Sequence, residues 1–182
     1  LALAPVATFA AAEGDRSPGA VAAADPLAVE AGLSTLRAGG NAADAAVAVA
    51  LVLAVVHPEA GNLGGGGFAV VRQRGEVRAL DFRETAPAAA TRDMFLGNDR
   101  APVPERSLVG PLAAGVPGSP AGLFELHRAC GRLPWRDVVA PAVDLARRGF
   151  PVSERLARSI EREKGLPSRF RETSRAWLPR GR

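Results

Sequence analysis

The charged residues Asp81, Arg83 and Glu84 offer the clearest chemistry in this sequence. They follow a glycine run at positions 64–67, and residues with the character of a short hairpin separate the two. A guanidinium group can hold a carboxylate through two parallel hydrogen bonds, and glycine lets a backbone come close to a ligand. We therefore predict that Arg83 binds a substrate carboxylate and that Glu84 and Asp81 support it. The residue types alone favour a plainer alternative, in which Arg83 only pairs with a neighbouring carboxylate.

The glycine run raises the question of phosphate binding. A phosphate-binding P-loop continues into Lys and then Ser or Thr, and it opens a helix N-terminus. Here the run is followed by Phe68 and by residues with the character of a β-strand. We therefore expect no nucleotide, and we predict that the glycines permit close backbone packing or the approach of a ligand.

Side chains that could hold a metal are few. Cys130 is the single cysteine, which excludes an intramolecular disulfide, and His57 and His127 are the two histidines. No carboxylates are spaced to complete a metal site with them, so we predict no metal in this chain. His57 precedes a proline at a helix end and His127 lies on an ordinary amphipathic helix, so both are expected to be structural.

The chain is basic, with a net charge of +4, and its arginines gather from Arg147 onward. Such a segment could bind nucleic acid. Glutamates are interleaved with these arginines, however, and few aromatic residues accompany them. We therefore expect solvated helix faces and no nucleic-acid partner.

Periodic apolar residues and turn signals predict a mixed α/β chain with few strands. The predicted strands cover residues 19–24, 68–71 and 77–82, of which the last two form a hairpin turning near 74–76. The predicted helices cover residues 26–38, 42–56, 136–148 and 154–164, together with a helix that follows the turn at 116–120 and runs to about Cys130. Residues 91–104 are polar and irregular, which indicates a surface loop.

The helix that ends at Val56 is apolar on every side from Ala45 onward. Asn41 is its expected N-cap, and Asp44 lies in its first turn, where the helix dipole favours a negative charge. It is too short to cross a bilayer, which takes about 20 apolar residues, so we expect no membrane span. A helix of this kind needs neighbours on all sides, and we predict a buried core helix packed against a sheet in a layered fold.

Residues 1–12 read LALAPVATFAAA, and their apolar character and small final residues fit a signal-peptide cleavage pattern. We predict that they are the remnant of a signal peptide and that the protein is periplasmic or secreted. A plain alanine-rich terminus is the alternative. Residues 13–182 hold too few predicted strands to close a sheet, so we expect their domain to continue beyond this chain.

Several longer motifs occur in order along most of the chain. They are GGNAADAA at 39–46, HP at 57–58, GNLGGGGF at 61–68, DFRETAP at 81–87, PGS at 117–119, LPW at 133–135 and GFPVS at 149–153. Together they resemble the gamma-glutamyltransferases, also called gamma-glutamyltranspeptidases or glutathione hydrolases. By this resemblance, residues 13–182 are the N-terminal portion of the family's large subunit.

The resemblance implies a fold and an activity for the complete protein. The fold would be the αββα sandwich of the N-terminal-nucleophile hydrolases, incomplete in this chain. A precursor would cleave itself, and a threonine exposed at the start of the small subunit would become the nucleophile, with its own amine as general base. The enzyme would take the gamma-glutamyl group from glutathione or related compounds and pass it to water, an amino acid or a peptide. No cofactor is needed.

The resemblance also changes the interpretation of the charged cluster. Arg83 matches the family arginine that binds the alpha-carboxylate of the gamma-glutamyl substrate, which favours the clamp over a local ion pair. The catalytic threonine would belong to the small subunit, so we expect no catalytic residue in this chain and no activity from it alone. Two alternatives are open: a related acylase acting on cephalosporin-type amides, and a non-catalytic fragment or binding module.

Overall fold

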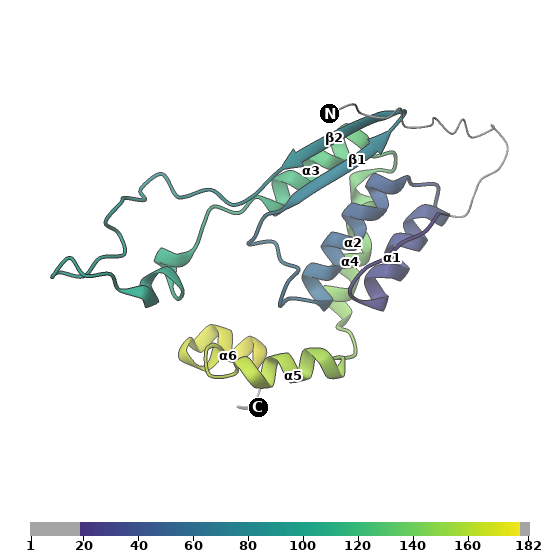
Figure 1. The fold of residues 1–182 in the computed structure, drawn as a ribbon. Helices are drawn as coiled ribbons and strands as arrows, with labels where there is room; N and C mark the ends of the chain where they lie inside the picture. The colour runs from purple at the N-terminus through teal and green to yellow at the C-terminus, as the bar shows by residue number, and fades with distance from the viewer. Residues whose placement is uncertain (1–18, 179–182) are drawn as a thin grey trace, which may run out of the picture.

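The computed structural model describes residues 19–178, which form a mixed structure of helices and one hairpin (Figure 1). The elements are, in order, α1 (Pro26–Arg37), α2 (Ala42–Val56), β1 (Phe68–Gln73), β2 (Glu76–Asp81), α3 (Ser119–Cys130), α4 (Trp135–Arg148), α5 (Glu154–Glu163) and α6 (Arg171–Trp177). Short 3-10 turns lie at Pro104–Ser107, Pro111–Ala113 and Pro167–Arg169. The signal peptide predicted at residues 1–12 lies outside the described residues.

The first two helices begin where their capping residues predict. The Asp25 carboxylate accepts a hydrogen bond from the backbone N–H of Leu27 at 2.9 Å, and Pro26 occupies the first helical position. The side chain of Asn41 accepts from the N–H groups of Ala43 and Asp44, while the Asp44 carboxylate accepts from the N–H of Asn41. This reciprocal capping box fixes the start of α2.

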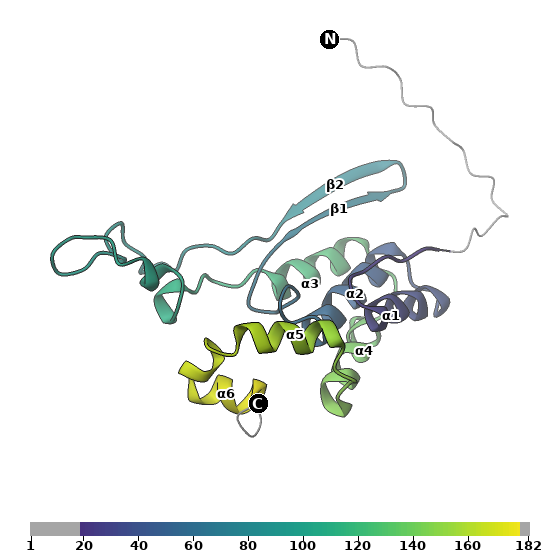
Figure 2. The same ribbon diagram turned by 60° about the horizontal axis from the view of Figure 1, so that its bottom comes forward.

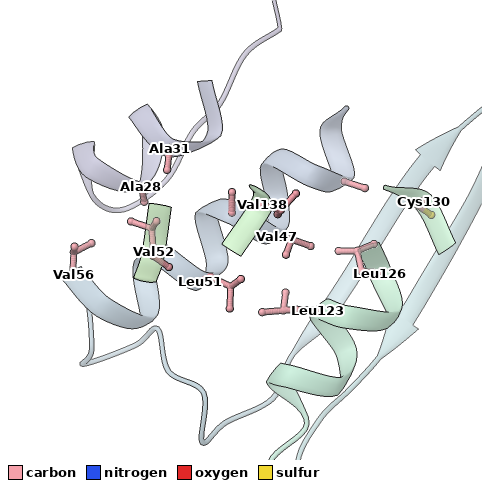
Figure 3. Close-up of a cluster of buried hydrophobic side chains, with 13 residues drawn as sticks. Ala28, Ala31, Val47, Leu51, Val52, Val56, Leu123, Leu126, Cys130 and Val138 are labelled. Carbon is pink, nitrogen blue, oxygen red and sulfur yellow. The ribbon is translucent and has the colours of Figure 1, made fainter. Parts of the chain in front are cut away.

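Helix α2 is the centre of the hydrophobic core (Figure 3). Its residues Val47, Val52 and Val56 are almost completely buried. The predicted buried helix is therefore confirmed, but the predicted packing against a sheet is largely wrong: α1, α3 and α4 are its main neighbours. The hairpin reaches the same core only through partly buried apolar side chains, namely Ala69, Val71 and Leu80. Of the helices in residues 19–178, none has the length and apolar character to cross a membrane.

The sheet of the described chain consists of β1 and β2, paired antiparallel with Phe68 opposite Asp81 and Gln73 opposite Glu76. The hairpin turn at Arg74 and Gly75 takes φ values of 52° and 82°, the positive values that a tight hairpin turn requires. Alternation along the strands leaves one face toward the helices and the other toward solvent. Phe68 and Val70 on the outer face are 66% and 74% exposed.

Residues 19–24 do not form the predicted strand. They run as irregular chain beside α1 and α2, and residues 19–22 line an apolar hollow with Leu36 and Val49. A strand exists only through hydrogen bonds to a neighbouring strand. Within residues 19–178 the hairpin strands pair only with each other, so the apolar run at 19–24 has no partner there.

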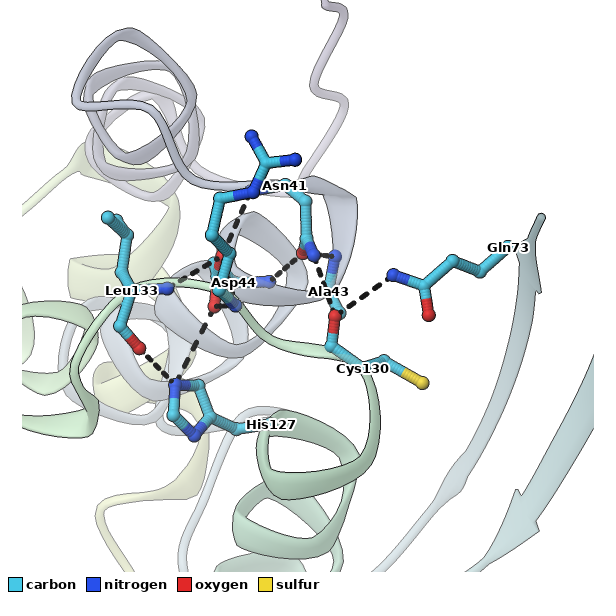
Figure 4. A network of polar contacts seen from close by, with 8 residues as sticks. Asn41, Ala43, Asp44, Gln73, His127, Cys130 and Leu133 are labelled. Carbon is cyan, nitrogen blue, oxygen red and sulfur yellow. Dashed lines mark hydrogen bonds and ion pairs between the residues drawn. The ribbon is translucent and has the colours of Figure 1, made fainter.

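A buried carboxylate joins the beginning of α2 to the turn between α3 and α4 (Figure 4). Asp44 has no exposed surface. Besides the N–H of Asn41, its oxygens accept hydrogen bonds from the backbone N–H groups of Arg132 at 3.0 Å and Leu133 at 3.3 Å. His127 lies beside Asp44 and Leu133. Its Nε2 atom is 2.8 Å from the Leu133 carbonyl oxygen and 3.6 Å from the Asp44 carboxylate. These contacts give His127 the structural place that the sequence predicts.

The carbonyl oxygen of Cys130, at the end of α3, extends this network to the hairpin. It accepts hydrogen bonds from the side-chain amide of Asn41 at 2.6 Å and from that of Gln73 at 3.2 Å. Gln73 is the last residue of β1. The turn end of the hairpin is therefore attached to the C-terminal end of α3, whose carbonyl also binds the N-cap residue of α2.

Helix α5 is attached to the turn that follows α2. A guanidinium nitrogen of Arg155 lies 2.7 Å from Nδ1 of His57, and another pairs with the Glu59 carboxylate. Burial and the nearby Arg155 charge, in that order, lower the pKa of His57, while Asp25 acts weakly in the opposite sense. Glu59 lies 3.2 Å from the imidazole and would favour its charged form, but its carboxylate is engaged by Arg155.

Removing one acceptor from the buried carboxylate is expected to destabilise the fold. In an Asp44→Asn variant, an amide NH₂ replaces an oxygen that faces backbone N–H groups, so buried donors lose their partner. We expect the free energy of unfolding, measured in urea, to fall by about 1–3 kcal/mol. Glu125→Gln, which alters an exposed carboxylate paired with Arg128, is the matched control and should leave it unchanged within error. Equal stabilities of the two variants would contradict the role of Asp44.

The depressed pKa of His57 predicts a loss of stability in mild acid. The folded state binds a proton at this site less readily than the unfolded state, whose pKa is about 6.5. The contribution of the neutral His57 to the free energy of unfolding is complete above that pH and decreases as the pH falls below it. We expect the free energy of unfolding to fall less between pH 7.5 and 5.5 in His57→Gln than in the unchanged protein. Parallel pH profiles would show that this imidazole is not the group responsible.

Candidate functional site

Arg83 lies where three backbone segments meet at the base of the hairpin. Asp81 is the last residue of β2, and residues 82–85 continue from it without helical or sheet structure apart from one bridge at Thr85. Residues 65–67 precede β1, and residues 115–119 lead into α3. Beyond Thr85, the chain projects from the body as a long arm before it returns at Val116 (Figures 1 and 2).

Hydrogen bonds fix the backbone on both sides of Arg83. Before it, the N–H of Phe82 donates to the Gly67 carbonyl at 3.0 Å, and the Gly67 N–H donates back at 3.4 Å. After it, Thr85 and Val116 exchange hydrogen bonds of 3.3 and 2.9 Å. Only Arg83 and Glu84 lie between these two pairs, so the position of the guanidinium-bearing backbone is defined from both directions.

The segment before β1 is also joined to the segment before α3. The carbonyl oxygen of Gly65 accepts hydrogen bonds of 2.9 Å from the N–H groups of both Gly118 and Ser119. The approach is so close that a side chain would not fit. A Cβ atom on Gly118 would lie 1.9 Å from the carbonyl oxygen of Phe82, and one on Gly66 would lie 2.5 Å from the same oxygen. The close backbone packing predicted for the glycine run is therefore confirmed, and Gly118 takes part in it.

The side chain of Arg83 points to the exposed side of the hairpin. Its guanidinium carbon lies 5.9 Å from the centre of the Phe68 ring, a distance at which a cation is attracted to the face of an aromatic ring. Among residues 19–178, Arg83 forms no salt bridge, unlike many arginines of the chain. The plainer alternative from the sequence, a local ion pair with Asp81 or Glu84, is therefore not found in the structure.

The two acidic neighbours occupy different positions. One oxygen of Asp81 accepts a hydrogen bond from the backbone N–H of Arg83 at 3.0 Å, so Asp81 contacts the Arg83 backbone and not its guanidinium. Glu84 packs its Cβ close to Gly115, and its carboxylate forms no hydrogen bond within the described chain. The support predicted for Asp81 has a geometric basis, whereas the support predicted for Glu84 stays a prediction.

Sequence reasoning missed the two phenylalanines of this site. Phe68 lies near the guanidinium on the outer face of the hairpin, and Phe82 packs on α3, as described below. The motifs GNLGGGGF and DFRETAP contain both residues, but the alternation of strand faces is the signal that could have assigned them to opposite sides. The sequence indicates Val116 and Gly118 only as part of a turn.

The arrangement provides an exposed positive charge on a fixed backbone, which suits an anion with a planar, two-oxygen head. Arg83 does not line the apolar pocket between Pro58 and helices α5 and α6. A ligand of Arg83 therefore meets it on an open surface of the described chain.

Comparison with known proteins gives consistent matches over most of the chain. The family profile described as Gamma-glutamyltranspeptidase matches residues 28–182. A glutathione hydrolase proenzyme of Escherichia coli strain K12 is 50% identical over 144 residues, which are 79% of this chain and 25% of that protein. One of Pseudomonas aeruginosa is 48% identical over 137 residues, or 75% of this chain and 25% of that protein. The chain thus spans about a quarter of these relatives.

A solved structure has the same arrangement of elements. The gamma-glutamyltranspeptidase of Helicobacter pylori superposes with a TM-score of 0.85 at 42% sequence identity, covering 88% of this chain and 46% of that chain. The predicted α/β fold class is confirmed by this likeness and by the observed mixture of helices and strands. Residues 19–178 contain only part of a layered sandwich: one hairpin with helices on its inner face.

Proposed function

The chain belongs to the gamma-glutamyltranspeptidase family, and on that basis we propose that the whole protein is a gamma-glutamyltransferase and glutathione hydrolase. It would cleave the gamma-glutamyl amide of glutathione and pass the glutamyl group to water, an amino acid or a peptide. In this proposal, residues 13–182 form the N-terminal portion of the large subunit. They supply the group that binds the alpha-carboxylate of the donor.

The observation that carries the proposal is the state of Arg83. Its guanidinium is exposed, and it forms no salt bridge within residues 19–178, while its backbone is hydrogen-bonded on both sides. Because the backbone of Arg83 is already fixed, only its side chain loses freedom when a ligand binds, so more of the contact energy appears as affinity. A charge-assisted hydrogen bond of this kind contributes roughly 1.5–3 kcal/mol.

Binding the alpha-carboxylate serves catalysis by placing the scissile amide. In a gamma-glutamyl group, a short carbon chain joins the alpha-carboxylate to the gamma-carbonyl, so fixing one end confines the other. The threonine nucleophile, which the family resemblance places outside this chain, would attack the gamma-carbonyl and release the amine, and water or an acceptor amine would then take the glutamyl group. Holding the carbonyl close to the nucleophile raises kcat/KM for the donor.

Partners and location follow from the same proposal. The relatives bear the name proenzyme, which supports a precursor that is processed into a large and a small subunit. The partners would then be the small subunit of the same precursor, glutathione or another gamma-glutamyl donor, and an amino acid or peptide acceptor. Export to the periplasm or the medium rests on the sequence of residues 1–12 alone, and it stays a prediction.

The alternatives from the sequence make different predictions for Arg83. An acylase of cephalosporin-type amides would turn over such an amide in preference to a gamma-glutamyl donor. A non-catalytic binding module would bind glutamate without turnover. Donor selectivity in the full-length protein separates all three, because they predict turnover of gamma-glutamyl donors, turnover of cephalosporin-type amides, and binding without turnover.

Replacing Arg83 tests the proposal directly. In the full-length protein, Arg83→Met removes the carboxylate contact and should raise KM for a gamma-glutamyl donor roughly 10- to 100-fold, as expected from the loss of a charge-assisted hydrogen bond. Arg83→Lys keeps the charge but loses the pair of parallel hydrogen bonds, so its KM should lie between those of the unchanged protein and Arg83→Met. Steady-state kinetics measure both, and Glu84→Gln in the same series tests the predicted support.

Arg78→Lys is the matched control, because Arg78 is an exposed arginine of β2 that pairs with Glu76. It should leave KM unchanged. A normal KM in Arg83→Met would contradict the clamp, and a folded full-length protein that turns over no gamma-glutamyl donor would contradict the proposed activity.

A further inference from the structure

Phe82 packs closely against two glycines, yet the proposed chemistry does not use it. A Cβ atom on Gly122 would lie 2.1 Å from Cγ of Phe82 and 2.4 Å from its Cβ. A Cβ atom on Gly67 would lie 3.1 Å from the edge of the same ring. The Phe82 side chain is therefore seated directly against the backbone of α3, in a space that exists because position 122 has no side chain.

Glycine at position 122 makes α3 less stable, and the contact with Phe82 explains why a glycine is needed there. It lies inside α3, where glycine is about 1 kcal/mol less favourable than alanine. Alanine would strengthen the helix but would occupy the space that the Phe82 ring fills. The glycine therefore allows β2 and α3 to approach closely at this point, in agreement with the side-by-side placement of the two elements (Figure 1).

Helix α3 is itself firmly placed. Leu123 and Leu126, which follow Gly122, are buried in the main hydrophobic core (Figure 3). At its far end, the carbonyl of Cys130 is held by Asn41 and Gln73. A side chain that packs on Gly122 is therefore held in place relative to the hydrophobic core.

The direction of Arg83 follows from that of Phe82. Phe82 exchanges backbone hydrogen bonds with Gly67, so the ladder of the hairpin continues through it. Successive side chains of an extended chain point to opposite faces. With Phe82 turned toward α3, Arg83 is turned to the outer face, where its guanidinium lies near the Phe68 ring.

We propose that Phe82 is a positioning residue for substrate binding, which orients the Arg83 guanidinium by seating the segment on Gly122 of α3. This inference rests on the proposed function, in which Arg83 binds the alpha-carboxylate of a gamma-glutamyl donor. Phe82 itself does not touch the substrate. Its effect is on the geometry of the carboxylate contact, and therefore on KM for donors that carry this carboxylate.

The test uses the full-length protein with two variants that disturb the contact from opposite sides. Phe82→Leu removes the ring, and Gly122→Ala pushes the ring off the helix while improving helix propensity. Each is assayed with a gamma-glutamyl donor and with the same amide in which hydrogen replaces the alpha-carboxylate. Phe124→Leu is the matched control, because Phe124 lies on the same helix and packs on Trp135 instead of on the Arg83 segment.

We expect both variants to raise KM for the carboxylate-bearing donor by about 10-fold, with kcat changed less than about twofold, because a displaced guanidinium weakens the carboxylate contact equally in the bound substrate and in the transition state. The kcat/KM for the donor without the carboxylate should stay as in the unchanged protein, and Phe124→Leu should not alter the ratio between donors. Equal losses for both donors, or none in either variant, would overturn the inference. A variant that fails to fold leaves the decision to the other one, and failure of both to fold would assign Phe82 a structural role only.

The Arg83→Met variant separates this inference from the proposed function. If Arg83→Met abolishes the preference for the carboxylate-bearing donor while the Phe82 and Gly122 variants keep it, the clamp holds and the positioning role fails. If Arg83→Met keeps the preference, the clamp itself fails.

Discussion

The absence of side chains where three backbone segments cross is the constraint on which the candidate site depends. The carbonyl of Phe82 lies so close to residues 66 and 118 that a methyl group on either would overlap with it. The segments then exchange hydrogen bonds directly, and the residues on either side of the Arg83–Glu84 pair are fixed. A flexible, charged side chain thereby stands on a rigid base, which is the arrangement that a binding site for a small anion requires.

The hairpin lies along α3 and is attached near both ends of that helix. At the end near Cys130, the Gln73 side chain bonds the helix carbonyl, and the buried Asp44 carboxylate secures the same region through the α3–α4 turn. At the other end, Gly118 and Gly122 admit the backbone and ring of Phe82. Burial of a carboxylate is costly unless its oxygens are hydrogen-bonded, and here backbone N–H groups satisfy it. The polar network and the glycine contacts therefore fix one element, the hairpin that carries Arg83.

Local signals in the sequence predicted the structural features that depend on interactions between neighbouring residues. Asp25 and Asn41 predicted two helix starts, and Gly75 predicted the hairpin turn. The role of Arg83, which the motif around it indicates, stays a prediction. The strand expected at residues 19–24 failed because a strand needs a partner that local composition does not reveal. Helix α6 was missed because its seven residues carry no side-chain cap. The seating of Phe82 on Gly122 joins positions 40 residues apart, and only the folded structure brings them together.

The most direct test of this account is a structure of the full-length protein with glutamate bound. The account predicts that two oxygens of the alpha-carboxylate accept hydrogen bonds from the Arg83 guanidinium at about 2.7–2.9 Å, with the Phe82 ring still against Gly122. A glutamate whose alpha-carboxylate is bound by another cationic group, with Arg83 turned away from it, would contradict the central claim.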